Sequence, residues 1–262
     1  MNLDLRKKHA LVGGSSAGLG LASAVELALL GADITLMARN ESRLRQAITQ
    51  LDISSGQKHD WLAADFNNNG DVKQAIEGLL KRRGPVHILV NNTGGPKPGL
   101  AIEASPDEYL QAFCQHLLNF QEITQAVSRG MKEANYGRII NIISTSVKEP
   151  IPGLGVSNTI RAAVAAWGKT LSRELGPFGI TVNNLLPGYT RTARYESLII
   201  GIMKNTGRSA AEAEHEIVRN IPLGRIGEPG DFGAVVAFLC SPAAAYVNGV
   251  SLPVDGGWLH ST

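Results

Sequence analysis

The sequence predicts an α/β fold with a doubly wound parallel sheet of about seven strands and helices on both faces. Short apolar runs typical of buried strands alternate with longer runs whose apolar residues recur every three or four positions, along the whole 262-residue chain. Strands that alternate with helices in this way form parallel sheets, because right-handed crossover helices cover both faces. No repeat, low-complexity tract or linker interrupts the alternation, so we expect a single domain over residues 1–262.

The strand runs are short, rich in branched aliphatic residues and bounded by turn-forming residues. In chain order, strands are expected at residues 9–12, 33–38, 61–64, 87–91, 138–143, 181–186 and 250–254. The helical runs between them carry apolar residues at helical spacing, and several begin at Pro, Asp or Ser. Helices are therefore expected at residues 18–30, 41–51, 71–81, 107–133, 161–175 and 230–240.

A segment at residues 190–222 departs from this alternation. It carries a cluster of aliphatic residues at 198–203 and then a polar helical run at about 209–218. Because it follows a strand at its carboxyl end, where ligands of open α/β sheets bind, it is interpreted as a helical lid over the site. The alternative is a satellite helix pair without a role in binding.

Composition excludes several classes of protein. The chain has 25 basic and 23 acidic residues without a dense basic cluster, which disfavours nucleic-acid binding. The longest uncharged stretch, residues 232–254, is broken by polar residues, Pro and Gly, so no membrane span is expected. No signal peptide is expected, because the basic residues 6–8 lead into a glycine-rich loop rather than an apolar segment. Cys114 and Cys240 are the two cysteines, without C-x-x-C spacing, which predicts neither a disulfide scaffold nor a metal site and favours the cytoplasm.

A glycine-rich loop joins the first predicted strand to the first predicted helix. Its sequence is Gly-Gly-Ser-Ser-Ala-Gly-Leu-Gly at residues 13–20. Glycines allow positive φ angles and close backbone approach, so the helix N-terminus can present free N–H groups to a pyrophosphate. The alternative is a tight turn without a ligand. The dinucleotide site of a Rossmann-type fold is accordingly predicted at Gly14, Ser15, Ser16, Gly18, Leu19 and Gly20.

The spacing Gly-x-x-x-Gly-x-Gly resembles that of the short-chain dehydrogenase/reductase family, including the 3-oxoacyl-(acyl carrier protein) reductases. Further motifs resembling that family follow in order, namely Asp65, Asn-Asn-Thr-Gly at residues 91–94, Pro-Gly at 187–188 and Val-Asp-Gly-Gly at 254–257. The resemblance implies a homodimer or homotetramer that packs through the helices at 107–133 and 161–175. It also implies further contacts to the dinucleotide from Asp65, Phe66, Asn92, Gly94, Arg161, Pro187, Gly188 and Thr192.

Cofactor choice depends on the end of the second strand. An acidic residue there would bind the ribose of NAD, whereas this chain has Ala38 followed by Arg39. A guanidinium suits a 2′-phosphate, so NADP is favoured, with NAD remaining possible. The alternative is that Arg39, together with Arg43, only solvates the start of the next helix.

The catalytic motif of the family is altered. The family uses Asn, Ser, Tyr and Lys, and alignment of the fifth strand places Ser144 at the serine position. Ser157 then stands at the tyrosine position, Arg161 at the lysine position and His116 at the asparagine position. No tyrosine occurs between residues 137 and 188, and none of the five tyrosines precedes a lysine by four positions, so the Tyr-x-x-x-Lys pair is absent.

These replacements change the chemistry unequally. Ser157 is a poor general acid, because an aliphatic hydroxyl is far less acidic than a phenol. Arg161 cannot relay a proton near neutral pH and is interpreted as a cofactor or anion anchor. His116 could exchange protons with water, or it is an ordinary hydrogen-bonded helix histidine. Tyr189 could reach the site with its hydroxyl, or it packs under the lid.

The main functional prediction is an NADP-dependent oxidoreductase that transfers a hydride to or from a small carbonyl or alcohol substrate, with an altered proton relay. The aliphatic segment at 198–203 and the lack of a charged cluster aimed at an anion favour an apolar substrate, with an acyl thioester as one candidate. The alternative is a non-catalytic NADP(H)-binding sensor or oligomer partner. Dehalogenase relatives also use an arginine, but they keep the tyrosine and lack the glycine loop.

Overall fold

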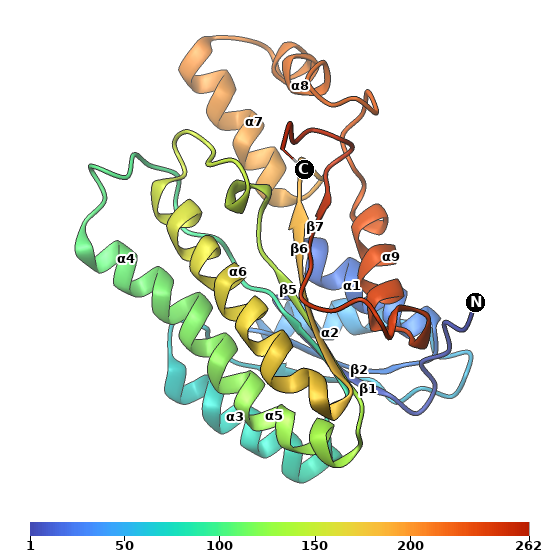
Figure 1. Ribbon diagram of the computed structural model, residues 1–262. Coiled ribbons are helices and arrows are strands. Elements are labelled where there is room, and N and C mark those ends of the chain that lie inside the picture. Colours follow the sequence, from blue (N-terminus) through green and yellow to red (C-terminus); the bar gives the residue numbers. More distant parts are fainter. Residues whose placement is uncertain (262) are drawn as a thin grey trace.

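The structure, a computed structural model, describes residues 1–261 and contains a seven-stranded parallel sheet. The strand order is β3-β2-β1-β4-β5-β6-β7, which is the doubly wound arrangement expected (Figure 1). Every predicted strand is present within one residue at each end. The observed strands are β1 His9–Gly13, β2 Asp33–Ala38, β3 Asp60–Ala63, β4 Ile88–Asn91, β5 Gly137–Ile142, β6 Ile180–Pro187 and β7 Ser251–Val254.

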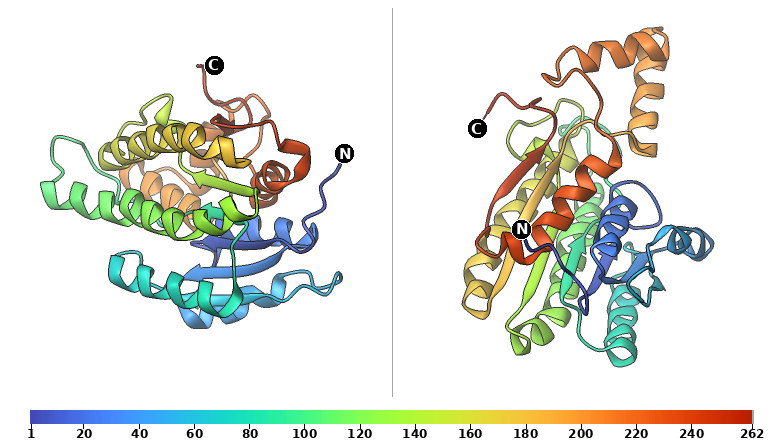
Figure 2. Two further views of the ribbon diagram at one scale, coloured as in Figure 1. Left: turned by 60° about the horizontal axis from the view of Figure 1, so that its bottom comes forward. Right: turned by 90° about the vertical axis from the view of Figure 1, so that its right-hand side faces the viewer.

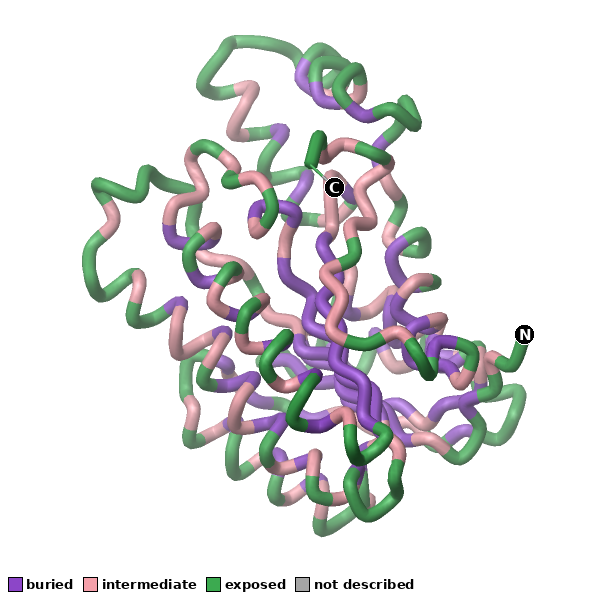
Figure 3. The backbone as a smooth tube through the Cα atoms, in the orientation of Figure 1, coloured by how far each residue is buried: buried purple, intermediate pink, exposed green. Residues whose placement is uncertain are grey.

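Helices cover both faces of the sheet. One face carries α1 Gly18–Leu29, α2 Glu41–Ala47 and α9 Pro229–Cys240, and the other carries α3 Asn69–Arg83, α5 Asn119–Glu133 and α6 Gly155–Leu175. Alternate strand residues face alternate layers, so Ala10 and Val12 of β1 pack toward α1 while Leu11 packs toward α3. Figure 2 shows the two helical layers from the side, and Figure 3 shows that the buried residues are concentrated in the strands between them.

The predicted helix at 107–133 is wrong as one continuous α-helix. It consists of α4 Pro106–Phe113, a π-helical segment Cys114–Leu118, and α5. Apolar periodicity runs through all three parts, because a π turn adds a residue without ending the helix. Such turns are frequent at functional sites, and this one contains His116, a residue predicted for the active site.

The helix predicted at 161–175 begins six residues earlier, at Gly155 in α6. A contact that is distant in sequence starts the helix there. The Gly155 N–H donates to the carbonyl of Gly99, and a Cβ on Gly155 would lie 2.5 Å from the backbone of Ala101. Only a glycine allows this close approach, and no local pattern reveals it. The run predicted at 41–51 similarly ends as α2 and becomes a 3-10 turn at Ile48–Gln50.

The segment at residues 190–222 forms two helices, α7 Ala193–Thr206 and α8 Ala210–Val218, beyond the carboxyl ends of β6 and β7 (Figure 1). They pack on a small apolar cluster that includes Tyr195, Ile199 and Ile217. Each helix has an N-cap, Thr192 for α7 and Ser209 for α8. These helices agree with the helical insertion expected there.

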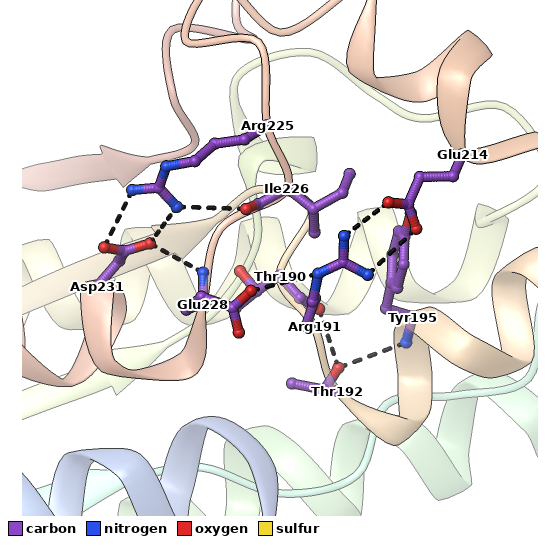
Figure 4. Close-up of polar contacts among 9 residues, drawn as sticks. All are labelled: Thr190, Arg191, Thr192, Tyr195, Glu214, Arg225, Ile226, Glu228 and Asp231. Carbon is purple, nitrogen blue, oxygen red and sulfur yellow. Dashed lines mark hydrogen bonds and ion pairs between the residues drawn. The ribbon is translucent and has the colours of Figure 1, made fainter. Parts of the chain in front are cut away.

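Ion pairs at the base of this insertion join it to the rest of the protein. Arg191 forms a bidentate pair with Glu214 of α8, at 2.6 and 3.2 Å, and its Nε lies 3.2 Å from Glu228 at the start of α9. Arg225 pairs with Asp231 in α9 (Figure 4). Ion pairs therefore link the start of α7 with α8 and with the start of α9, and both arginines have carboxylate partners.

Candidate cofactor and active site

The glycine loop between β1 and α1 leaves the helix N-terminus open. Gly14 and Gly18 have φ angles of 56° and 58°, in the left-handed region that favours glycine. A Cβ on Gly20 would lie 2.4 Å from the carbonyl oxygen of Gly14. Ala17 supplies no side-chain cap to α1, and the first turn contains no acidic residue. The free N–H groups and the positive dipole end of α1 therefore suit the pyrophosphate of a dinucleotide.

Residues from two other segments pack against this loop. The Asn92 amide donates to the carbonyls of Gly13 and Gly14, at 3.2 and 3.3 Å, which fixes the loop from the end of β4. A Cβ on Gly18 would lie 3.5 Å from the Thr192 methyl group, so the start of α7 also reaches the loop. The structure therefore brings together three segments that sequence motifs predicted separately.

The serines and Leu19 of the loop differ in their surroundings. The buried Ser15 hydroxyl donates to the carbonyl of Val12 and accepts from the N–H of Met37, at 2.7 and 2.9 Å. Both bonds hold the loop onto β2, so this hydroxyl serves the fold. Ser16 is half-buried, and Leu19 packs against the apolar layer of α1. Of the predicted cofactor contacts in the loop, Ser15 has its side chain committed elsewhere.

A cavity of about 580 Å³ lies at the carboxyl ends of β2 and β3. The N–H of Asp65 donates to Asp71, which fixes the loop after β3, and Phe66 packs within 3.4 Å of the Cβ position of Gly13. These positions fit the adenosine end of a dinucleotide. The residues that line the cavity are Arg39, Asn40, Ala63, Ala64, Asp65 and Asp71.

Arg39 at this cavity is exposed and forms no ion pair with any described residue. Helix α2 is capped by Asn40, whose side chain accepts from the N–H of Arg43 at 2.9 Å. Arg45 forms an ion pair with Glu41 within the same helix. The start of α2 is thus satisfied without Arg39, so its guanidinium is available to the cavity.

The Pro-Gly motif after β6 is supported by the Val-Asp-Gly-Gly motif after β7. The N–H of Gly188 donates to the carbonyl of Val254 at 3.1 Å, and a Cβ on Gly188 would lie 2.6 Å from the Asp255 side chain. The Asp255 carboxylate accepts from the N–H groups of Gly257 and Leu259. Gly188 is therefore required by close packing, and the second motif holds the first in place.

Ser157 and Arg161 lie one turn apart on α6. The Arg161 Nη1 donates to the carbonyls of Ile142 and Ile143, at 3.1 and 2.9 Å, and its Nε donates to the Ser157 Oγ at 3.3 Å. Burial, and secondarily the charge of Arg194, lower the pKa of Arg161 to about 10. The guanidinium remains protonated at neutral pH and is fixed at the end of β5.

Ser144 lies two residues beyond β5, immediately after the carbonyl of Ile143 that Arg161 binds. Its Oγ accepts from the N–H of Ser146 at 3.0 Å. The hydroxyl proton of this half-buried serine is left to donate outward. The geometry therefore suits a hydrogen bond to a substrate oxygen.

His116 lies in the π-helical segment with its ring edge-on to Phe120 at 5.9 Å. Its Nε2 is buried and has no hydrogen-bond partner among residues 1–261. Burial and then the charge of Arg161 lower the pKa of His116 to about 3, while the backbone of Gly94 acts in the opposite direction. The imidazole is therefore neutral at pH 7, which argues against His116 as the proton donor.

Tyr189 packs edge-on against Trp258, with ring centroids 5.5 Å apart. It also lines a cavity of about 300 Å³ with residues of α7 and α8. Burial raises the pKa of its phenol, which makes the proton harder to release. No described contact joins Tyr189 to Ser144, so the structure favours its packing role.

Sequence reasoning missed Arg194 in the first turn of α7. A Cβ on Gly95, directly after Gly94, would lie 3.3 Å from Nη2 of Arg161 and 3.6 Å from Nη1 of Arg194. No charged cluster aimed at an anion was evident in the sequence, whereas the structure places two positively charged side chains beside Gly95. The folded chain brings together two arginines that are 33 positions apart, and no local pattern shows this contact. The one signal available was the closeness of Arg194 to the predicted cofactor contact Thr192.

The structure holds no evidence of a metal centre in its described part. Residues 1–261 contain no group of three or more His, Cys, Asp or Glu side chains placed to hold a metal ion. Cys114 is half-buried and Cys240 is buried, and both are free thiols. None of the helices in the same range combines the length and hydropathy needed to cross a bilayer.

Comparison with known proteins defines the class. The family model described as Enoyl-(Acyl carrier protein) reductase matches residues 14–259. The chain therefore belongs to this family of short-chain dehydrogenases/reductases, as the glycine loop and the Asn-Asn-Thr-Gly motif indicated.

Particular relatives resemble the chain over its full length. The 3-oxoacyl-[acyl-carrier-protein] reductase FabG of Pseudomonas aeruginosa is 33% identical over 262 residues, covering 99% of this chain and 100% of the relative. The NADPH-dependent reductase BacG of Bacillus subtilis is 30% identical, covering 98% and 100%. Among solved structures, L-sorbose reductase from Gluconobacter frateurii, complexed with NADPH and L-sorbose, has a TM-score of 0.94 at 28% identity, with both chains fully covered.

Proposed function

We propose that the protein is an NADP(H)-dependent oxidoreductase that interconverts a small carbonyl compound and its alcohol. NADPH, when bound, supplies the hydride for the reduction. The open N-terminus of α1 suits the pyrophosphate, and the unpaired guanidinium of Arg39 suits a 2′-phosphate. FabG and BacG, which the chain resembles along its length, are named as reductases, and BacG as NADPH-dependent.

The observation that carries the proposal is the position of Ser144 beside Arg161. The Ser144 hydroxyl donates to the carbonyl oxygen of the substrate. The fixed positive charge of Arg161 stabilises the negative charge that develops on that oxygen during reduction. With a pKa of about 10 and no neighbouring phenol, Arg161 acts electrostatically and does not release a proton at pH 7.

The proton that completes the alcohol therefore comes from solvent water. Ser157 cannot supply it, because its hydroxyl is weakly acidic and accepts a hydrogen bond from Arg161. The neutral ring of His116 can hold a water through its unpartnered Nε2. In this proposal the relay of the family is replaced by a fixed cation and water.

The insertion at residues 190–222 serves as the lid of this site, and residues 1–262 act as one catalytic unit. Helices α7 and α8 enclose the cavity lined by Tyr189 and Trp258, and Thr192 and Arg194 reach the loops after β1 and β4. A homodimer or homotetramer would pack through the segments at 107–133 and 161–175, the first of which carries the exposed Leu110 and Leu118. The two free thiols suit a reducing compartment such as the cytoplasm.

A second candidate function is NADP(H) binding without turnover, as in a sensor or oligomer partner. The replacement of the family's tyrosine and lysine by Ser157 and Arg161 favours it, because a proton donor near neutral pKa is lost. NADPH would then bind as tightly, but no carbonyl would be reduced.

Steady-state NADPH oxidation over a panel of ketones, β-ketoacyl thioesters, quinones and ketoses separates the two functions. We expect at least one compound to be reduced, and Ser144→Ala to lower kcat/KM by about 100-fold, the usual cost of removing a donor to a developing oxyanion. Ser128→Ala, which removes a half-buried hydroxyl of α5 that donates to the carbonyl of Gln125, is the matched control. Tight NADPH binding without any turnover would overturn the oxidoreductase proposal and support the second candidate.

A further inference from the structure

Two arginines from different elements flank Gly95 in the loop after β4. Nη2 of half-buried Arg161 and Nη1 of exposed Arg194 each lie within 3.6 Å of the position that a Cβ on Gly95 would take. The two nitrogens are therefore separated by less than twice that distance. At this spacing, an oxyanion that lies between the two guanidinium groups can accept a hydrogen bond from each of them.

Neither arginine has a carboxylate partner among the described residues. Arg161 donates to the carbonyls of Ile142 and Ile143, and Arg194 donates through both Nη atoms to the carbonyl of Pro96 at 3.2 Å. These neutral acceptors fix the guanidinium groups without compensating their charge. The Nη2 of Arg161 has no hydrogen bond to any described group. The pair is thus held in place with charge and donor capacity to spare.

Other arginines of the same region are compensated. Arg191 binds the carboxylates of Glu214 and Glu228, and Arg225 binds that of Asp231 (Figure 4). Arg191 lies only three residues before Arg194, so this part of the chain has carboxylates nearby, yet none of the described carboxylates pairs with Arg194. Arg194 therefore differs from Arg191 and Arg225, whose ion pairs join the helices of this region.

The surroundings of the pair also lack a compensating charge. Burial, and then the charge of the nearby Arg161, lower the pKa of His116, so its ring is neutral at pH 7. The buried Nε2 of His116 has no partner and is a further polar atom at the same place. A ligand that carries negative charge would satisfy both guanidinium groups.

We propose that Arg161 and Arg194 together bind a carboxylate of the substrate, so that the protein acts on keto acids or the corresponding hydroxy acids. This inference rests on the proposed oxidoreductase function and names its substrate class. Arg161 is bonded to the carbonyl of Ile143, directly before Ser144. The carboxylate site therefore adjoins the carbonyl site, and the two groups are separated by few bonds in the substrate.

Matched acids and neutral analogues test the proposal. The probes are 4-oxopentanoate, 2-oxo-4-phenylbutanoate and 4-oxocyclohexanecarboxylate, each compared with its primary amide. Binding to the protein saturated with NADP+ is measured by isothermal titration calorimetry, and reduction is measured with NADPH. We expect at least one acid to bind about tenfold more tightly than its amide, as for a charge-assisted bidentate contact.

Variants of Arg194 assign the preference to the pair. Arg194→Gln is expected to reduce the preference for the acid to within about twofold, and Arg194→Lys to retain most of it, because the charge is kept. Arg219→Gln is the matched control, since it removes one exposed positive charge near the end of α8. NADPH affinity is measured separately by cofactor fluorescence and is expected to change by less than about threefold in Arg194→Gln.

The outcomes distinguish this proposal from the proposed function. Equal binding of every acid and its amide, with ketones still reduced, overturns the carboxylate site and leaves the oxidoreductase intact. Weakened NADPH binding in Arg194→Gln with an unchanged acid preference assigns the pair to the cofactor and also overturns the proposal. An Arg194-dependent acid preference without any reduction supports the carboxylate site and overturns the oxidoreductase function.

Discussion

At the scale of single residues, Arg161 alters the chemistry open to the site. Its charge is fixed by two backbone carbonyls at the end of β5, and a pKa of about 10 keeps it protonated at neutral pH. A lysine in that position, paired with a tyrosine, would allow a proton relay. A site with Arg161 and Ser157 can stabilise negative charge but needs water as its source of protons.

Arg39 carries the prediction of cofactor choice. Because Asn40 already caps α2, replacing Arg39 with alanine removes a phosphate partner without uncapping the helix. We expect Arg39→Ala to weaken NADPH binding by about tenfold and to leave NADH binding nearly unchanged, as measured by fluorescence titration. Arg45→Ala, which breaks the ion pair to Glu41 in the same helix, is the control. An equal loss for both cofactors would assign Arg39 to the fold alone.

The sequence could predict residues defined by spacing along the chain, but not those defined by tertiary approach. Ser144, Ser157 and Arg161 followed from their distances to the fifth strand. The structure places Ser144 just beyond β5 and Arg161 on α6, and it places Ser157 in the first turn of α6, which precedes the helix predicted at 161–175; their roles stay predictions. Arg194 was missed because its contact with Gly95 spans about a hundred residues. The pKa of His116 depends on burial, which the sequence does not show.

At the scale of elements, the turn from β1 into α1 positions the cofactor site. Two glycines in the left-handed region and the close contact of Gly20 with Gly14 keep the N-terminus of α1 open. The loop is held by Asn92, directly after β4, rather than by a side-chain cap. The N–H groups that a cap would occupy are therefore available to a phosphate.

Two glycine substitutions with opposite expected effects test this reading. In Gly20→Ala, the Cβ would lie 2.4 Å from the Gly14 carbonyl, so the loop must shift and NADPH affinity should fall by at least about tenfold. In Gly78→Ala, within α3, the Cβ meets no atom within 4 Å, and the higher helix propensity of alanine should stabilise the fold by about 1 kcal/mol. Urea unfolding and NADPH titration measure both. Unchanged NADPH affinity in Gly20→Ala would contradict the proposed role of the loop.

Element types were predictable because strands and helices here have clear periodicity, whereas boundaries set by distant contacts were not. All seven strands agree within one residue. The helix α6 begins at Gly155 because the loop at residues 99–101 approaches its backbone. The π turn at Cys114–Leu118 preserves the apolar pattern and so leaves no mark in the sequence.

At the scale of the whole molecule, the parallel sheet brings the carboxyl ends of β1, β4, β5 and β6 together at one end of the sheet. Motifs far apart in the sequence meet there, and the insertion carrying α7 and α8 lies beyond the same end of the sheet (Figure 1). At the opposite end of the sheet, where the strands begin, the side chain of His9 is buried. His9 lies between β2 and the segment before β4, with Nε2 2.8 Å from Thr35 and Nδ1 3.2 Å from the carbonyl of Pro85.

This burial predicts a loss of stability in mild acid. Burial, more than the nearby charge of Arg83, lowers the pKa of His9 to about 4, below the ordinary value of 6.5. Between these values the unfolded chain binds the proton and the folded protein does not, so stability is full above pH 6.5 and falls as the pH decreases toward 4. We expect His9 to account for a loss of about 2 kcal/mol in the free energy of unfolding between pH 7 and pH 5.

Urea unfolding at the two pH values measures this loss. His9→Asn should reduce the pH dependence by about that amount, whereas His260→Asn, at an exposed position, should leave it unchanged. His116, whose pKa is lowered to about 3, contributes a loss of the same sign and remains in both variants. Identical pH dependence in His9→Asn and the unaltered protein would contradict the role given to buried His9.

The central claim is hydride transfer at Ser144 and Arg161 without a phenol. It is tested most directly by incubating excess protein with the ketone panel and NADPH that is deuterated at both C4 positions, followed by mass spectrometry of the alcohols. We predict an alcohol that carries one deuterium at its carbinol carbon, formed at least about 100-fold more slowly by Ser144→Ala. Bound deuterated NADPH with no deuterated alcohol from any ketone would contradict the claim.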